Sequence, residues 1–284
     1  LVTADIDGYI DADSEHGAIY IFDDFEDGEA LATSDAMLTL YGSSEDQIGL
    51  QTIATDDLTG DGIPDIASMF TSGEIIIHSG DVSGVRDVYI GLISIKDTTG
   101  DDSFAGQMGA ADFSGDGRSD LLVGSPELTD MNYYEGRAYL LPGPITGDVS
   151  VVDDGIAIYS ESDEAARFGC QVASAGDTNG DGILEAMISA RGASFSGVYH
   201  GGAVYFFAGS MLNGTVHAAD ADAVLYGTTT YGYMGYDISG GSDVNGDGYD
   251  DVFINAGNSD GGAYVFLGPL GEIRDDTSAD SQIH

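Results

Sequence analysis

Four nine-residue segments of the chain carry oxygen-bearing side chains at the same alternating positions. They occupy residues 57–65, 112–120, 177–185 and 243–251. In each segment, positions 1, 3, 5 and 9 hold a carboxylate, an amide or a hydroxyl group, and position 6 is glycine. Glycine allows the backbone to turn sharply there. Hard oxygen ligands on alternating positions of a tight turn suit Ca²⁺, with metal–oxygen distances of about 2.3–2.6 Å.

Other readings of these loops fit less well. Magnesium demands stricter geometry and keeps its water, and zinc or copper sites use histidine or cysteine, which no loop contains. An EF-hand needs a glutamate at position 12 and flanking helices, as a dockerin-type module needs helices after its loops. Here position 12 is Ser68, Val123, Ile188 and Ile254, within strand-like sequence. A solvated turn would also use Asp and Gly, but four copies in register argue against it.

A fifth, weaker copy spans residues 3–11. Thr3 stands in place of the leading aspartate, and Ile6 in place of a loop glycine. Asp5, Asp7 and Asp11 are weaker metal candidates, and the segment is either a weak site or an empty loop.

The sequence around each loop predicts short strands. An apolar residue followed by glycine precedes the loop, as in Phe168-Gly169 and Met234-Gly235, and an apolar run follows it. A glycine-led alternating segment comes next, such as residues 202–207. Each unit of about 60 residues thus reads as four strands, which is typical of propeller blades. A stack of independent hairpins is the alternative.

We therefore predict an all-β, single-domain β-propeller of about five four-stranded blades. The expected repeat units are residues 1–42, 43–102, 103–160, 161–227 and 228–284.

Composition limits the partners. The 284 residues include 50 Asp and Glu against 7 Lys and Arg, a formal net charge of −43. Such a chain repels nucleic acid and anionic lipid. No apolar run approaches 18 residues, so we expect no membrane insertion. Hydrophobic residues make up 42% of the chain, enough for a core. The single cysteine, Cys170, excludes an internal disulfide and is expected to be buried.

Taken together, these motifs resemble the FG-GAP repeat of integrin alpha-chain propellers and related bacterial surface proteins. The resemblance covers essentially the whole chain, and the segment from Phe168-Gly169 through residues 202–207 fits best. It implies a β-propeller with calcium in the loop that joins the first two strands of a blade.

The resemblance also implies four calcium sites, with a candidate fifth at the first copy, and assigns the ligands by position. The side-chain ligands would be Asp57, Thr59, Asp61, Asp65; Asp112, Ser114, Asp116, Asp120; Asp177, Asn179, Asp181, Glu185; and Asp243, Asn245, Asp247, Asp251. The backbone carbonyls of Ile63, Arg118, Ile183 and Tyr249 would complete them. Glu185 departs from the family's aspartate and has a longer reach.

Calcium is expected to be structural. A site saturated at 100 times its dissociation constant adds about 2.7 kcal/mol to stability. Four such sites would rival the whole stability of a domain, roughly 5–15 kcal/mol. Because cytosolic calcium is scarce, this predicts an extracellular or cell-surface location.

The two ends of the chain look incomplete for a closed ring. The first strand of the first unit would precede Leu1, and the polar tail, residues 269–284, looks like a poor last strand. Open strand edges recruit other chains. The ring is therefore a small propeller, part of a longer chain, or closed by a neighbouring copy, and pairing between copies would build an oligomer or filament.

No segment carries a catalytic motif. The five histidines are expected at the surface or in turns, and the tyrosine-rich stretches, such as residues 231–236, either pack between blades or stack on sugars. Three functions follow. The favoured one is a calcium-stabilised, non-catalytic extracellular adhesion or scaffold protein. The alternatives are a self-assembling filament subunit and a carbohydrate-binding module, so the expected partners are proteins, other copies of the chain or surface glycans.

Overall fold

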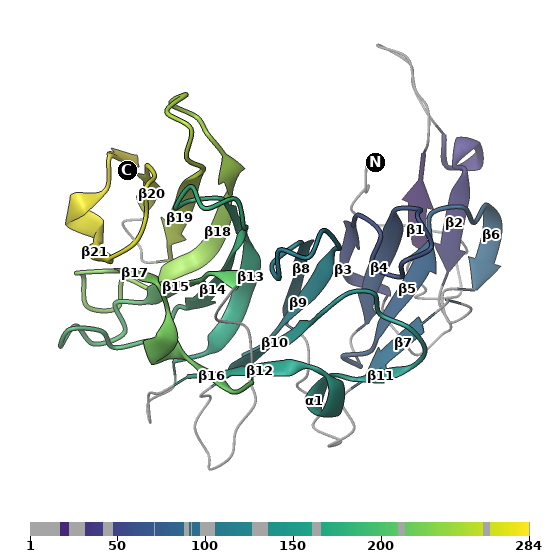
Figure 1. Cartoon of the computed structure of the whole chain (residues 1–284), viewed down its shortest axis with the longest axis horizontal. Coiled ribbons are helices and arrows are strands. Elements are labelled where there is room, and N and C mark those ends of the chain that lie inside the picture. The colour runs from purple at the N-terminus through teal and green to yellow at the C-terminus, as the bar shows by residue number, and fades with distance from the viewer. Residues whose placement is uncertain are drawn as a thin grey trace.

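The computed structural model describes residues 18–22, 32–41, 48–70, 72–87, 91, 93–96, 106–126, 136–160, 166–209, 214–257 and 262–283. Within these residues the chain is built almost wholly of strands, arranged in five sheets. Successive sheets follow one another in chain order, from the purple end at β1 and β2 to the yellow end at β20 and β21 (Figure 1). We number these sheets as blades 1 to 5. The expected all-β, propeller-type architecture is confirmed.

The strands of blades 1 and 2 come from the first hundred residues, apart from one short strand. Blade 1 contains β1 (Ala18–Ile21), β2 (Leu38–Tyr41) and β6 (Gly84–Asp87). Blade 2 contains β3 (Ile48–Ala54), β4 (Asp65–Phe70), β5 (Ile75–Ser79), β7 (Ile93–Lys96) and β11 (Val149–Ser150).

Blades 3 and 4 repeat the strand order of blade 2, and blade 5 repeats its first four strands. Blade 3 contains β8 (Gln107–Ala111), β9 (Asp120–Ser125), β10 (Arg137–Leu141), β12 (Ile156–Tyr159) and β16 (Val216–His217). Blade 4 contains β13 (Phe168–Gly176), β14 (Glu185–Ala190), β15 (Ala203–Phe207), β17 (Ala223–Tyr226) and β21 (Ile273–Asp275). Blade 5 contains β18 (Met234–Ser242), β19 (Asp251–Ala256), β20 (Gly262–Phe266) and β22 (Ser281–Ile283).

The second strands of blades 2 to 4 are completely buried. Every residue of β4, β9 and β14 is buried. These strands lie inside their sheets, and both faces pack against neighbouring blades, which explains why their sequences are continuous apolar runs rather than alternating ones. One core cluster joins Met69 of blade 2 to Val123 of blade 3, and another joins Met187 of blade 4 to Ile254 of blade 5. The core therefore lies between blades.

Neighbouring blades also exchange a short strand. In blades 2 to 4 the first four strands are antiparallel, and a further strand from the next repeat pairs in parallel with the fourth strand. In blade 1 a strand from the next repeat pairs in the same way with β2. These pairs are β6 on β2, β11 on β7, β16 on β12 and β21 on β17. In three of them a short helical turn follows at once, namely α1 (Val151–Asp154), η3 (Ala218–Asp220) and η4 (Asp276–Ser278). A blade is thus completed by the repeat that follows it.

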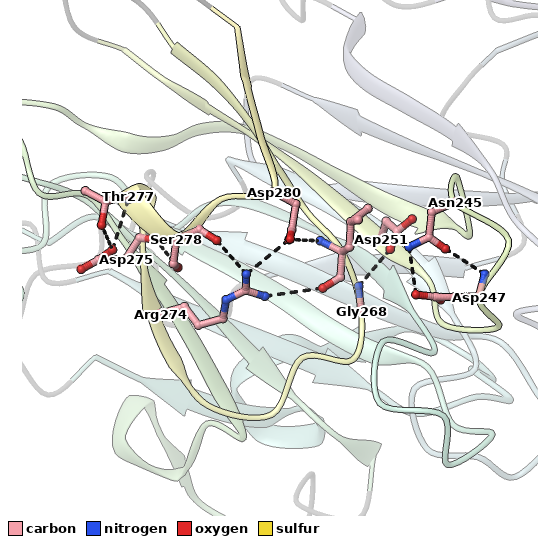
Figure 2. A network of polar contacts seen from close by, with 10 residues as sticks. Asn245, Asp247, Asp251, Gly268, Arg274, Asp275, Thr277, Ser278 and Asp280 are labelled. Atoms are coloured by element: carbon pink, nitrogen blue, oxygen red, sulfur yellow. Dashed lines mark hydrogen bonds and ion pairs between the residues drawn. The ribbon is translucent and has the colours of Figure 1, made fainter.

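The polar tail forms real structure, so the expectation that it makes a poor last strand is wrong. Its β22 is the fourth strand of blade 5, and its β21 joins blade 4. Strand pairing uses backbone groups, so a polar edge strand needs little apolar sequence. Arg274 helps to hold the tail, because its guanidinium donates to Ser278 O at 2.8 Å and to Asp280 Oδ2 at 3.3 Å (Figure 2).

Candidate metal centres

The four predicted loops lie at equivalent places in the fold. Each joins the first and second strands of its blade, between β3 and β4, β8 and β9, β13 and β14, or β18 and β19. The first carboxylate of each loop accepts hydrogen bonds from three backbone N–H groups. In the third loop, Asp177 accepts from Gly180 at 2.7 Å, from Asp181 at 3.1 Å and from Gly182 at 3.0 Å. The same three bonds recur in the other loops.

Glycine at position 6 is required by the backbone. Gly182 has φ 88°, and its counterparts are Gly62, Gly117 and Gly248, with φ of 87°, 85° and 96°. L-residues with a side chain are strained in this region. The sharp turn predicted at this position is therefore present.

The carboxylate at position 9 is buried in every loop. Asp65, Asp120, Glu185 and Asp251 are at most 1% exposed. Each accepts a hydrogen bond from the N–H of the residue at position 2 or 3 of its own loop. The carboxylate at position 9 therefore links the end of the loop to its beginning. A buried carboxylate is costly unless hydrogen bonds or a cation compensate it.

The third loop brings its carboxylates closest together. Ligand atoms of Asp177, Asp181 and Glu185 all lie within 4.8 Å of one another. Two oxygens that share one calcium ion at about 2.4 Å lie at most about twice that distance apart, so this spacing fits the ion. The side-chain amide of Asn179 donates to Asp181 Oδ2 at 3.2 Å and to Glu185 Oε1 at 2.9 Å, so a positive partial charge already sits between them.

The second loop supplies a separate sign that it fits a cation. Ser114 Oγ, the predicted ligand at position 3, is buried and has no hydrogen-bond partner among the described residues. A buried hydroxyl oxygen without a partner is unfavourable, and coordination to a metal would satisfy it. In the described part of the chain, only the third loop gathers three carboxylates within the spacing given above.

Burial shapes the protonation of these loops. The pKa of Glu185 is raised to about 7, chiefly by burial and also by the charges of nearby Asp181 and Asp177, although two hydrogen bonds from Thr178 oppose the shift. Burial likewise raises the pKa of Asp65 and of Asp120. At the exposed Asp243 the pKa is lowered instead, chiefly by the N–H of Gly248. The buried position-9 carboxylates are therefore the groups whose charge most needs a counter-ion.

Sequence reasoning missed how the loops contact the next blade. Thr178 O accepts the N–H of Leu270 at 2.9 Å, and Leu58 O accepts that of Ile145 at 2.8 Å. Asp177 also exchanges two hydrogen bonds with Asp250 of blade 5, at 2.9 and 3.1 Å. A repeated signal was available, because Gly-Pro followed by Ile145 or Leu270 recurs just after the third strand of blades 3 and 5.

The position-9 carboxylates of blades 3 and 5 also bind the Gly-Pro turn that follows the third strand of their own blade. Asp251 Oδ1 accepts the N–H of Gly268 at 2.9 Å, and Asp120 Oδ1 accepts that of Gly143 at 2.9 Å. Beside the first contact, the N–H of Leu267 donates to Asp280 Oδ2 at 2.9 Å. The same oxygen accepts a hydrogen bond from the guanidinium of Arg274 (Figure 2). The loops therefore connect directly to the elements that join one blade to the next.

The remaining predicted residues have mixed outcomes. Asp5, Asp7 and Asp11 lie outside the described residues. At position 7, the N–H groups of Ile63, Arg118, Ile183 and Tyr249 donate to the position-5 carboxylates, and metal binding by their carbonyls stays a prediction.

The expectations for cysteine and histidine fare differently. Cys170 is buried beside Ser189, as expected. His78 is buried at 2% exposure in β5, so the expectation of a surface or turn position is wrong for it, because β5 is covered by blades on both faces.

Comparison with known proteins agrees with this geometry. The FG-GAP repeat family model matches residues 104–141 and 234–266, which span the second and fourth loops. The chain carries FG-GAP repeats. The two matched FG-GAP repeats correspond to the first three strands of blades 3 and 5, including the calcium-type loop of each.

The chain is also similar to integrin alpha chains. Integrin alpha pat-2 of Caenorhabditis briggsae is 28% identical over 273 residues, which cover 86% of this chain and 21% of the relative. Integrin alpha-PS2 of Drosophila melanogaster is 28% identical over 236 residues, covering 80% and 16%. Integrin alpha-5 of Xenopus laevis is 31% identical over 164 residues, covering 54% and 14%. The chain thus spans about a fifth of the length of the first of these relatives. Within the described residues, no helix is long and apolar enough to cross a membrane.

Proposed function

We propose that this chain is a calcium-stabilised, non-catalytic adhesion or scaffold protein that works outside the cell. The observation that carries the proposal is the third loop, where three carboxylates lie within 4.8 Å of one another around one point. The similarity to integrin alpha chains also supports an adhesion function.

Calcium would act at the junctions between blades. Without a cation, two carboxylates about 4 Å apart repel by about 4 kcal/mol at an effective dielectric constant near 20. An ion held by Asp177, Asn179, Asp181 and Glu185 would relieve this repulsion. The same loop contacts blade 5 through Thr178 and Asp250. Ordering the loop would therefore strengthen the contact between blades 4 and 5, and the equivalent loops would do so elsewhere.

A stable array of blades suits adhesion better than catalysis. The carboxylates that recur in the repeats are used by the metal loops, and ligand-binding residues can vary in the other loops on a fixed scaffold. Because calcium is abundant outside cells and scarce in the cytosol, calcium-dependent stability supports an extracellular role.

Calorimetric titration of Ca²⁺ and thermal unfolding test this proposal. We expect up to four bound ions and a higher melting temperature in millimolar calcium than in EDTA. Asp181→Ala should abolish the binding of one Ca²⁺ ion and reduce the rise in melting temperature that calcium causes. Asp81→Asn, which removes an exposed carboxylate outside the loops, serves as the control and should change neither. Equal melting temperatures in calcium and EDTA would overturn the proposal.

A second function, assembly through strand pairing, is supported by blade 5. The fourth strands of blades 2 to 4, which are β7, β12 and β17, each carry a parallel strand from the next repeat, as does β2 of blade 1. Among the described residues no strand pairs with the outer edge of β22. An unpaired edge is a template for another strand. Light scattering in millimolar calcium would detect assembly as a mass that grows with concentration, whereas a constant single-chain mass would count against it.

A further inference from the structure

A cluster of aromatic side chains lies at the junction of blades 4 and 5. We call it the aromatic patch, and it consists of Tyr199, His200, Tyr231 and Tyr233. The rings of Tyr199 and Tyr231 meet edge to face at 5.4 Å, and the rings of His200 and Tyr231 are stacked at 5.7 Å. Tyr199 is 47% exposed and Tyr231 is 52% exposed. Large apolar rings so exposed in a chain of net charge −43 call for a ligand-based explanation.

Two chain segments that meet backbone to backbone hold the aromatic patch in place. One follows β14 (residues 191–202), and the other follows β17 (residues 227–233). Tyr231 N donates to Tyr199 O at 3.0 Å, Tyr233 N to His200 O at 3.2 Å, and Met234 N to Gly201 O at 2.8 Å. The rings therefore project from a fixed backbone and are ordered before any ligand arrives.

The backbone of the aromatic patch is strained. Among the described residues, five non-glycine residues have positive φ, and three of them are His200 (49°), Tyr231 (57°) and Tyr233 (52°). Such conformations cost of order 1–3 kcal/mol each and gather at functional sites, where other interactions enforce them. Glycine would avoid the strain at all three positions. Aromatic residues at strained positions point to a use for their rings.

The aromatic patch lies away from the metal loops. The third loop leads into the start of β14, whereas the segment 191–202 leaves from its end. Strand β14 is six residues long, so the patch and the loop lie at opposite ends of blade 4. A ligand at the aromatic patch would therefore not contact the carboxylates that we assign to calcium.

The surroundings favour a neutral, ring-shaped ligand. A net charge of −43 disfavours anions, and the guanidinium of Arg191 is engaged over the ring of Tyr236 at 5.3 Å. Flat tyrosine rings match the apolar C–H face of a pyranose, while their hydroxyl groups can bond sugar hydroxyls. A hollow of about 420 Å³, lined in part by Ser194 and Phe195, adjoins the same segment, and Ser194 Oγ accepts the N–H of His200.

We propose that the aromatic patch binds a neutral oligosaccharide by stacking sugar rings on Tyr199 and Tyr231. The proposal rests on the adhesion function given above and names the ligand class that such adhesion would use. It does not require calcium at the patch.

Binding of neutral hexasaccharides tests the proposal. Cellohexaose, xylohexaose, mannohexaose, laminarihexaose and chitohexaose would be titrated into the full chain in calcium buffer, followed by calorimetry and by tyrosine fluorescence, since the chain has no tryptophan. We expect at least one to bind. Tyr199→Ala should weaken it by at least 10-fold, whereas Tyr41→Ala, at a tyrosine 41% exposed in blade 1, should leave affinity unchanged.

A second variant separates binding from folding. Tyr231→Gly removes the ring and also relieves the positive φ, so we expect a melting temperature equal to that of the wild type or higher, together with a 10-fold or greater loss of affinity. No binding of any of the five sugars would overturn the proposal, as would binding unchanged in both patch variants. Binding of an oligolysine peptide at the patch in place of the sugars would overturn the carbohydrate assignment. Calcium-dependent melting measured in the same samples reports separately on the proposed function.

Discussion

Gly202 and Met234 form a parallel bridge between blades 4 and 5. A Cβ atom on Gly202 would lie 2.2 Å from Met234 O and 2.4 Å from Met234 N, closer than any real contact allows. Gly136 meets Phe168 in the same way between blades 3 and 4. The glycine that leads the third strand of one repeat and the apolar residue that opens the next therefore form a single contact, which explains why both recur.

Gly202→Ala should destabilise the protein strongly. The alanine would meet backbone atoms that cannot move aside, in addition to the strain of φ 84°. We expect the free energy of unfolding to fall by more than about 3 kcal/mol in urea denaturation, against about 1 kcal/mol for the backbone strain alone. Gly214→Ala is the matched control, since Gly214 has φ 80° and open space around it. Equal losses in the two variants would contradict the role of the interblade contact.

Glu185→Gln should change stability in opposite directions with and without calcium. The substitution removes a buried charge but keeps the shape of the side chain. In EDTA at pH 8 the variant should be more stable than the wild type, because no ion compensates the carboxylate. In calcium it should bind the ion about 10-fold more weakly, a loss of about 1.4 kcal/mol. Thermal unfolding in both buffers measures these changes. A variant less stable than the wild type in EDTA would contradict the view that the Glu185 carboxylate is destabilising without a bound cation.

The pH dependence of wild-type stability in EDTA should follow Glu185. Its pKa is about 7 in the fold and 4.5 in a model compound, so the folded state keeps its proton longer than the unfolded state. Stability should therefore fall as pH rises from about 4.5 to about 7, by on the order of 3 kcal/mol. Urea denaturation at a series of pH values measures the slope. In Glu185→Gln the stability should vary little between these two pH values. If the variant keeps the slope, the pH dependence arises from other groups.

Arg274→Lys should loosen the tail of the chain. The guanidinium contacts Ser278 O and Asp280 Oδ2 and lies 5.4 Å from the ring centre of Phe266. Lysine lacks the planar fork that makes several such contacts at once. We expect faster amide hydrogen exchange in β21 and β22 and a stability loss of about 1 kcal/mol. Arg86→Lys, at an exposed residue of β6, is the control. Unchanged exchange in the tail would show that strand pairing alone holds it.

Much of the fold and of the candidate metal centres could be predicted because the signals are local. The spacing of Asp177, Asn179, Asp181 and Glu185 places their oxygens within one tight turn, whatever the rest of the chain does. The buried run of β14 and the alternation of its neighbours likewise follow from nearby residues. Sequence reasoning failed in two places. The burial of His78 depends on neighbouring blades, and the strands of the polar tail form by pairing with β17 and β20, which lie earlier in the chain.

The sequence by itself thus determined the all-β repeat and the loops with calcium-type spacing, since both arise from contacts within a few residues. Only the tertiary structure decided that each of blades 1 to 4 receives a strand from the next repeat, that Thr178 and Leu270 join loop to blade, and that Tyr199 lies beside Tyr231. These contacts are made largely by backbone groups of residues far apart in the chain. Backbone hydrogen bonds are the same for almost every residue type, so they leave little trace in the order of the side chains.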